Sequence, residues 1–248
     1  AEMGAIRQRG ATSVELAIAL IVVLLLGMGV LQFVFVYQTR LAIEQAVIEA
    51  ARSGSTGHAS DEALQRGLAR GLAPLLYGAD DAADLQLGEA RALARIAAGQ
   101  AEGAISLRRL NPTDEAFADW EEPALDGFGE PIEGQVEIPN DNLDVRRTRS
   151  QPASGVAGHR GSEPIGASSG VTLVDANLLR VELVYGTRLT VPVAGRALAA
   201  TLRGWYGCNG GGGGGGAGTG SAADLCPHLL AEPPRLPLRA VATIRMMS

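Results

Sequence analysis

The sequence predicts an α+β fold, in which a long N-terminal helix precedes a domain with a small antiparallel sheet. Three patterns lead to this prediction. Residues 16–37 form an apolar run without a charged side chain. Helical spacing of apolar residues continues beyond this run as far as Arg52, and residues 179–193 alternate as strands do.

The apolar run predicts a membrane-crossing helix. At 1.5 Å per residue it covers roughly 30 Å, the thickness of the hydrocarbon core of a bilayer. A single isolated run in lipid must be helical, because only a helix satisfies its own backbone. Its one strongly polar side chain, Gln32, either bonds to another helix or extends toward the interface.

No helix breaker follows the run, so the helix continues as an amphipathic segment. The expected apolar stripe comprises Tyr37, Leu41, Ile43, Val47, Ile48 and Ala51. We therefore predict one helix from about Thr12 to about Arg52, on the order of 60 Å long. Gly54 is the natural C-terminal stop. These limits divide the chain into a leader (1–10), a continuous helix (11–53) and an α+β domain (54–248).

The remaining elements follow in order. Helices are expected at 61–76, where Gly67 and Gly71 weaken the segment, at 89–100 and, after a Thr-Asp-Glu cap, at 113–120. Strands are expected at 104–110, at 135–139 and near the end of the chain within 235–248. Residues 175–196 predict a β-hairpin that turns at Gly186 and Thr187. Flexible loops are expected near 150–170 and, around seven consecutive glycines, at 208–226.

The composition argues against several functions. The net charge of −6 disfavours binding to nucleic acid, which needs a basic surface, and Arg146, Arg147 and Arg149 are interpreted as a solvated loop. The three histidines lie far apart, and neither HExxH nor GxSxG occurs. We therefore predict no catalytic residue, no metal site and no cofactor.

Two cysteines, Cys208 and Cys226, flank the glycine run. In an exported protein the default is one disulfide, and in a cytosolic protein two free thiols. A disulfide between them would stabilise the folded chain by roughly 3 kcal/mol, because closing the loop lowers the conformational entropy of the unfolded chain.

The N-terminal junction carries the most specific pattern. A short tail with Arg7 and Arg9 ends at Gly10, and Ala11 is followed four residues later by Glu15 and then by the apolar run. This arrangement resembles a type IV prepilin leader, in which cleavage precedes the apolar helix, whereas a secretory signal is cleaved after it. More narrowly, RGATSVELAIAL with RLAIEQAVIEAAR resembles the TadE-like pilus-assembly proteins, pseudopilins of the tight-adherence (type IVb) pilus. The resemblance to this family reappears in residues 138–143, 175–196 and 235–248.

This resemblance implies that a prepilin peptidase cleaves between Gly10 and Ala11. It further implies a pilin-like domain in the periplasm, held by one helix in the bacterial inner membrane, with a Cys208–Cys226 disulfide. The implied function is that of a minor pseudopilin in assembly of an adhesive pilus, because the soluble part is longer than in a small major pilin. Implied partners are other pilins and pseudopilins, inner-membrane assembly proteins and membrane lipid. The alternative is a generic signal-anchored periplasmic binding or scaffolding protein.

Glu15 has two interpretations. Cleavage would create an α-ammonium at Ala11, one helical turn away, and a carboxylate beside lipid is costly unless it is paired. Its partner would be its own α-ammonium or that of a neighbouring subunit, and pairing between subunits would set their axial register. Alternatively, Thr12 and Glu15 form a capping box at the start of the helix.

Overall fold

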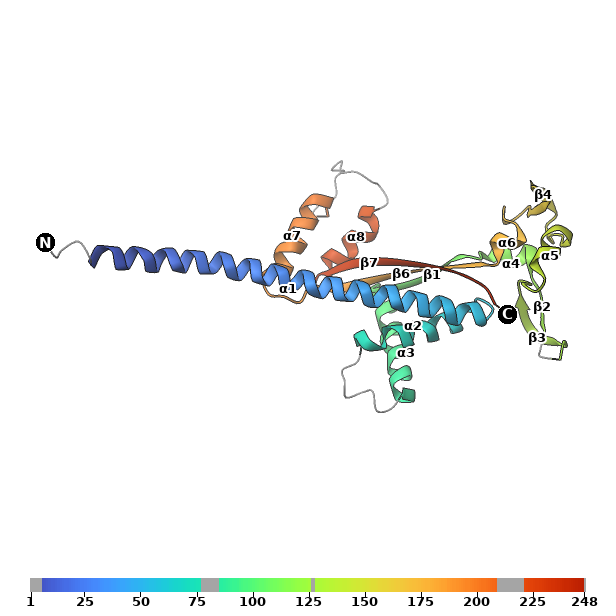
Figure 1. The fold of residues 1–248 in the computed structure, drawn as a ribbon, viewed down its shortest axis with the longest axis horizontal. Helices are drawn as coiled ribbons and strands as arrows, with labels where there is room; N and C mark the ends of the chain where they lie inside the picture. Colours follow the sequence, from blue (N-terminus) through green and yellow to red (C-terminus); the bar gives the residue numbers. More distant parts are fainter. Residues whose placement is uncertain (1–5, 77–84, 126–127, 209–220, 248) are drawn as a thin grey trace. The chain divides into compact units, whose positions relative to one another are not determined.

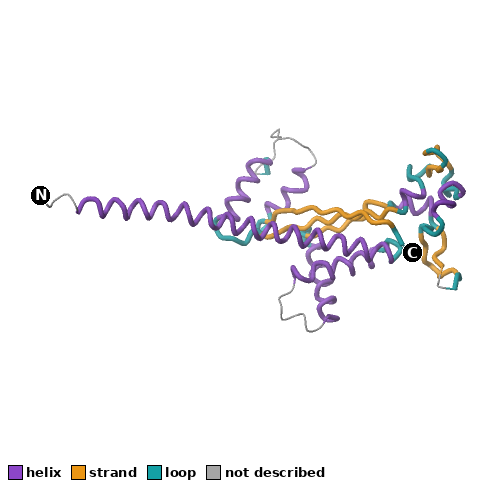
Figure 2. Tube along the Cα trace, in the orientation of Figure 1, coloured by secondary structure: helices purple, strands orange, loops and turns teal. Residues whose placement is uncertain are grey.

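The computed structural model describes residues 6–76, 85–125, 128–208 and 221–247, and its first element is helix α1 (Ile6–Thr56). The helix begins before the expected Thr12 and ends after the expected Arg52, so the predicted helix was too short at both ends. The described chain forms an α+β structure with small antiparallel sheets, as predicted (Figures 1 and 2). The glycine run at 209–220 lies outside the described residues.

The chain groups into two compact units. The first contains Ala1–Thr39 and Gly186–Leu238, and the second contains Arg40–Tyr185 and Arg239–Ser248. Helix α1 and the strands β6 (Leu178–Arg188) and β7 (Arg235–Arg245) contribute residues to both.

The second unit is built on a sheet in which β6 lies between β1 (Ile105–Asn111) and β7. Strand β1 pairs with β6 in antiparallel fashion, with Leu107 opposite Leu183. Leu179, Val181 and Leu183 are fully buried on one face of β6. On the other face, buried Glu182 forms an ion pair with Arg239. The predicted terminal strand is confirmed as β7.

Helix α2 (Asp61–Leu76) lies against the C-terminal half of α1, and α3 (Leu85–Ala101) follows it. A Cβ atom on Gly67 would lie 2.6 Å from the Glu49 carbonyl oxygen, and one on Gly71 would lie 2.4 Å from Cα of Ala46. The two glycines that weaken α2 as an isolated helix are thus what allows the two backbones to approach.

We expect Gly71→Ala to destabilise the second unit by about 1–3 kcal/mol, because the added methyl group overpacks the contact with α1. The matched control is Gly88→Ala in α3, where a Cβ meets no atom within 4 Å. This control should stabilise its helix by up to about 1 kcal/mol. Chemical denaturation measures both changes, and equal effects at the two positions would refute the close-packing explanation.

The predicted stripe on α1 is confirmed in part. Ile43, Val47 and Ala51 are buried as expected, whereas Tyr37 and Leu41 are about half exposed. The buried face continues toward the N-terminus through Thr39 and Gln32 instead. Helix propensity cannot choose this face, since the elements that cover it come from distant sequence.

The rest of the second unit consists of short elements. They are helices α4 (Asp114–Trp120), α5 (Leu143–Arg149) and α6 (Leu173–Ala176), and the hairpins β2–β3 (Glu122–Leu125 and Pro131–Glu137) and β4–β5 (Val156–Arg160 and Glu163–Gly166). The Thr113 cap of α4 is confirmed, because its hydroxyl accepts the Ala116 N–H. The prediction of a flexible loop near 150–170 is wrong where the chain forms β4 and β5. The three arginines form α5 and not a loop. Arg147 and Arg149 are exposed to solvent as expected, whereas Arg146 is half-buried and pairs with Glu122.

Asp119 ties the loop after β5 to α4. Its side chain is buried and accepts the Ser169 N–H at 2.9 Å. Burial alone would raise the pKa of this carboxyl, but hydrogen bonds from Ser154 and Ser169 outweigh burial and lower the pKa below its ordinary value.

A lowered pKa in the folded state means that Asp119 contributes stability above the pKa of the unfolded chain, about 3.9, and loses it as the pH falls further. We expect Asp119→Asn to reduce the acid dependence of unfolding below about pH 4. Urea denaturation at a series of pH values measures this dependence. If the free energy of unfolding falls with pH as steeply in the variant as in the wild type, Asp119 does not contribute to the acid dependence.

Candidate functional site

The N-terminal half of α1 is the first candidate site, because no described part of the chain covers its apolar side chains from Val14 to Leu31. From Val14 to Leu31 nearly every side chain is exposed, including Leu16, Leu20 and Leu24 at more than half of their surface. These residues span about 27 Å of helix. This is the one helix in the described chain that is long and apolar enough to cross a membrane.

Gly10, Ala11 and Glu15 all lie within α1, which begins four residues before Gly10. Thr12 lies inside the helix and not at its start. In the uncleaved chain Thr12 and Glu15 therefore do not cap the N-terminus of α1. Glu15 is exposed, one turn after Ala11. Its carboxylate is therefore sterically available to a second helix.

Gln32 marks the point at which α1 changes its surroundings. It is only 3 % exposed, and its Oε1 accepts the backbone N–H of Val191 at 3.0 Å. Both expectations for this residue were wrong, since it bonds to a loop of its own chain. The sequence offers only one signal for it, namely that Gln32 interrupts an otherwise apolar run.

We expect Gln32→Leu to destabilise the first unit by about 1–3 kcal/mol, because the buried Val191 N–H would lose its acceptor. Hydrogen exchange at the Val191 amide should accelerate accordingly. The control is Gln38→Leu, at an exposed position on the same helix. Slow exchange at Val191 in Gln32→Leu would show that this bond does not hold the loop.

The segment after Val191 forms a helical hairpin and not the second strand of the predicted β-hairpin. Strand β6 runs straight through Gly186 to Arg188, and α7 (Ala194–Tyr206) begins soon after Pro192. Pro192 lacks the N–H that a ladder requires, which explains why the apparent alternation from Leu189 to Val193 does not form a strand.

Helices α7 and α8 (Ser221–Leu230) share a small core with α1. Leu189, Ala199 and Leu229 are its buried centre, and Val36 of α1 packs against them. The Arg203 guanidinium donates to the Leu229 carbonyl oxygen at the end of α8. Cys208 and Cys226 are joined in a disulfide, with their Cα atoms 5.4 Å apart.

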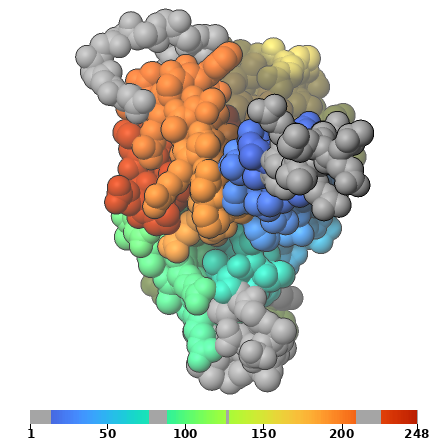
Figure 3. All heavy atoms as spheres, turned by 90° about the vertical axis from the view of Figure 1, so that its left-hand side faces the viewer, coloured from blue at the N-terminus to red at the C-terminus, as the bar shows by residue number. Residues whose placement is uncertain are grey.

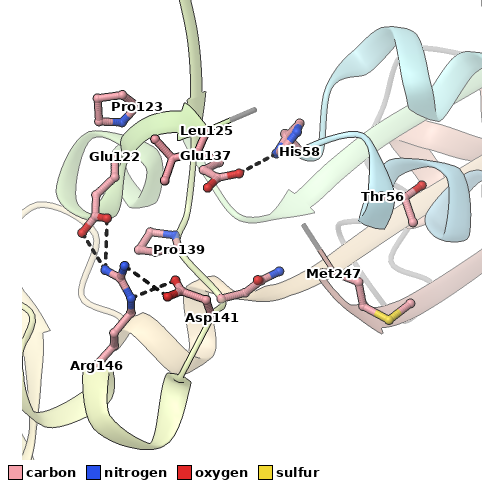
Figure 4. Close-up of a pocket in the computed structure, with 11 residues that line it drawn as sticks. Thr56, His58, Glu122, Pro123, Leu125, Glu137, Pro139, Asp141, Arg146 and Met247 are labelled. Carbon is pink, nitrogen blue, oxygen red and sulfur yellow. Dashed lines mark hydrogen bonds and ion pairs between the residues drawn. The ribbon is translucent and has the colours of Figure 1, made fainter. Parts of the chain in front are cut away.

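The second unit contains a separate hollow of about 490 Å³ near the β2–β3 hairpin (Figure 4). Arg146 lies between Glu122 and Asp141, at 3.0 and 2.9 Å, and His58 Nδ1 is 3.0 Å from Glu137. Burial would lower the pKa of Arg146, but the two carboxylates outweigh it and raise the pKa above its ordinary value. Arg146 and its two carboxylates satisfy one another, which makes this side of the hollow a structural ion-pair cluster.

One family model matches the chain, and the match lies within α1. Residues 10–52 match the model of the TadE-like protein family. This confirms the resemblance to the TadE-like proteins. No curated protein and no solved structure matches the chain.

Proposed function

We infer, from an N-terminal segment that matches the TadE-like family, that this chain is a minor pseudopilin in the assembly of a tight-adherence pilus. The family suggests a structural role in pilus assembly, and the single apolar helix fits a membrane anchor in such a protein. The observation that carries the proposal is the coincidence of the family match, residues 10–52, with a helix that is exposed in its first half and packed in its second.

In this proposal the chain is a prepilin-type precursor. A prepilin peptidase cleaves between Gly10 and Ala11 and leaves an α-ammonium at Ala11. The helix then holds the protein in the inner membrane, with everything after it in the periplasm. The Cys208–Cys226 disulfide supports this orientation, since such bonds persist in oxidising compartments.

Glu15 would pair with an α-ammonium in the assembled state. An isolated carboxylate at the margin of a bilayer is costly, and an opposite charge one helical turn away, or on an adjacent subunit, offsets that cost. Its exposure on α1 supports a role between subunits. The partners in this proposal are the peptidase, other pilins and pseudopilins, inner-membrane assembly proteins and membrane lipid.

The second candidate is a signal-anchored periplasmic binding or scaffolding protein that never joins a pilus. One observation favours it, namely that the family match ends at residue 52 while most of the chain follows. In that case α1 is an anchor, and neither Glu15 nor the Gly10–Ala11 bond has a role.

Photo-crosslinking in piliated cells separates the two candidates. A photoreactive amino acid at Leu20, exposed in the apolar half of α1, should crosslink to other pilins, and deleting the gene should abolish or reduce piliation. The same amino acid at buried Leu183 is the control and should give no such product. Normal piliation after deletion, together with no pilin crosslink at Leu20, would support the scaffolding candidate instead.

A further inference from the structure

Helix α7 presents an apolar face that its own unit leaves uncovered. Ala199 and Leu202 face the small core, whereas Ala194, Leu198, Thr201 and Trp205 lie at helical spacing on another face. Trp205 is 80 % exposed and Leu198 is 36 % exposed. None of these four side chains is charged. An exposed tryptophan on an apolar stripe is a feature that calls for a partner.

The position of α7 in the first unit identifies the partner. Figure 3 looks along α1 from its N-terminal end, and α7 occupies the face of this unit from which α1 emerges. Figure 1 shows α7 running away from α1 across that face. The helix starts three residues after Val191, which is bonded to Gln32. Helix α7 is thus fixed at the level where the exposed span of α1 ends.

That level is close to one edge of the bilayer. The uncovered span of α1, from Val14 to Leu31, is about 27 Å long against the roughly 30 Å thickness of the hydrocarbon core, and it ends six residues before the apolar run 16–37 does. Just beyond, Phe33, Phe35 and Tyr37 are exposed on α1, and Phe33 stacks on Tyr37. Aromatic side chains gather at membrane interfaces, and Trp205 on α7 adds to this group.

The charge of the segment agrees with a lipid surface. From Gly186 to Leu230 the sequence contains three arginines and one carboxylate, that of Asp224 in α8. The net positive charge favours contact with anionic headgroups.

We propose that α7 is an interfacial membrane anchor, whose face of Ala194, Leu198, Thr201 and Trp205 lies in the outer edge of the bilayer that α1 crosses. This proposal rests on the membrane insertion of α1 in the proposed function. Helices of this kind lie in the interface plane with the apolar face buried at the headgroup boundary. Because the Gln32–Val191 bond and the core around Val36 join α7 to α1, the anchor fixes the depth and rotation of α1.

Fluorescence quenching by brominated lipid tests the anchor on the full chain. The chain has two tryptophans, and Trp120 is buried in the second unit, so Trp120→Phe leaves Trp205 as the sole fluorophore. The protein is reconstituted into phosphatidylcholine–phosphatidylglycerol vesicles with bromines near the top of the acyl chains. If Trp120→Phe does not fold, the difference between wild type and Trp205→Phe gives the same quantity.

Two single-tryptophan variants in the Trp120→Phe, Trp205→Phe background calibrate the experiment. Leu24→Trp reports insertion of α1 into lipid. Phe128→Trp gives the signal of a tryptophan exposed to water, because this position in the second unit is 95 % exposed. We expect Trp205 to lose most of its emission to the brominated lipid and to be shielded from acrylamide, as Leu24→Trp is. We expect Phe128→Trp to show the reverse.

The outcomes separate the two proposals. If Leu24→Trp is quenched but Trp205 remains as accessible to acrylamide as Phe128→Trp, the anchor is overturned and membrane insertion of α1 stands. If Leu24→Trp is not quenched, insertion itself fails. If Trp205 is shielded from acrylamide but untouched by bromine, a protein covers α7, and the lipid assignment is wrong.

Discussion

Gly10→Phe should abolish maturation while leaving the protein in the membrane. In the proposed function the peptidase must bring its reacting groups onto the Gly10–Ala11 bond, and a glycine lets another backbone or active site approach closely. A phenylalanine there places a large side chain at the bond to be cleaved. The apolar run that drives insertion lies downstream and is unchanged.

The expected result is a chain that keeps its first ten residues in cells that contain the peptidase, as intact mass shows, and that remains in the membrane fraction after alkaline extraction. Gly4→Phe, in the same leader but away from the bond, is the control and should mature normally. Normal maturation of Gly10→Phe would remove the leader assignment.

Glu15→Ala should mature normally but assemble poorly. Breaking a desolvated ion pair leaves an unpaired charge and costs about 3–5 kcal/mol. At the lower end this corresponds to roughly a hundredfold weaker association between subunits. Piliation and the yield of crosslinks from Leu20 measure the loss. The control is Glu44→Gln, which removes an exposed acid that pairs with Arg40 on the same helix and should have little effect.

Glu15→Gln separates the two interpretations of this residue. Glutamine can replace glutamate in a capping box, but it cannot neutralise an α-ammonium. If charge pairing is the role, Glu15→Gln should assemble as poorly as Glu15→Ala. If Glu15→Gln assembles like the wild type, the capping box is the better explanation.

Elements defined by local patterns could be predicted from sequence. The long helix follows from an unbroken apolar run and the spacing after it, and the cap of α4 follows from Thr113 and the acids behind it. Strand β7 and the fold class were likewise predicted. The disulfide could be expected only on the condition of export, which composition alone does not establish.

Features that depend on distant partners could not be predicted. Gln32 bonds to Val191, and no local rule connects a membrane-type helix to a loop so far along the chain. Helix α7 was missed because Leu189, Val191 and Val193 alternate as in a strand, although Pro192 between them interrupts strand pairing. The helical spacing of Ala199, Leu202 and Tyr206 begins only after this stretch. The exposure of Tyr37 and Leu41 on α1 could not be predicted for the same reason, since the elements that cover the helix determine which of its residues are inside.

The most direct test of the proposed function is the N-terminal sequence of the membrane-bound protein, produced with and without a prepilin peptidase. The proposed function predicts a mature chain that starts at Ala11 only when the peptidase is present. An intact N-terminus in both cases, or cleavage beyond residue 30, would contradict it.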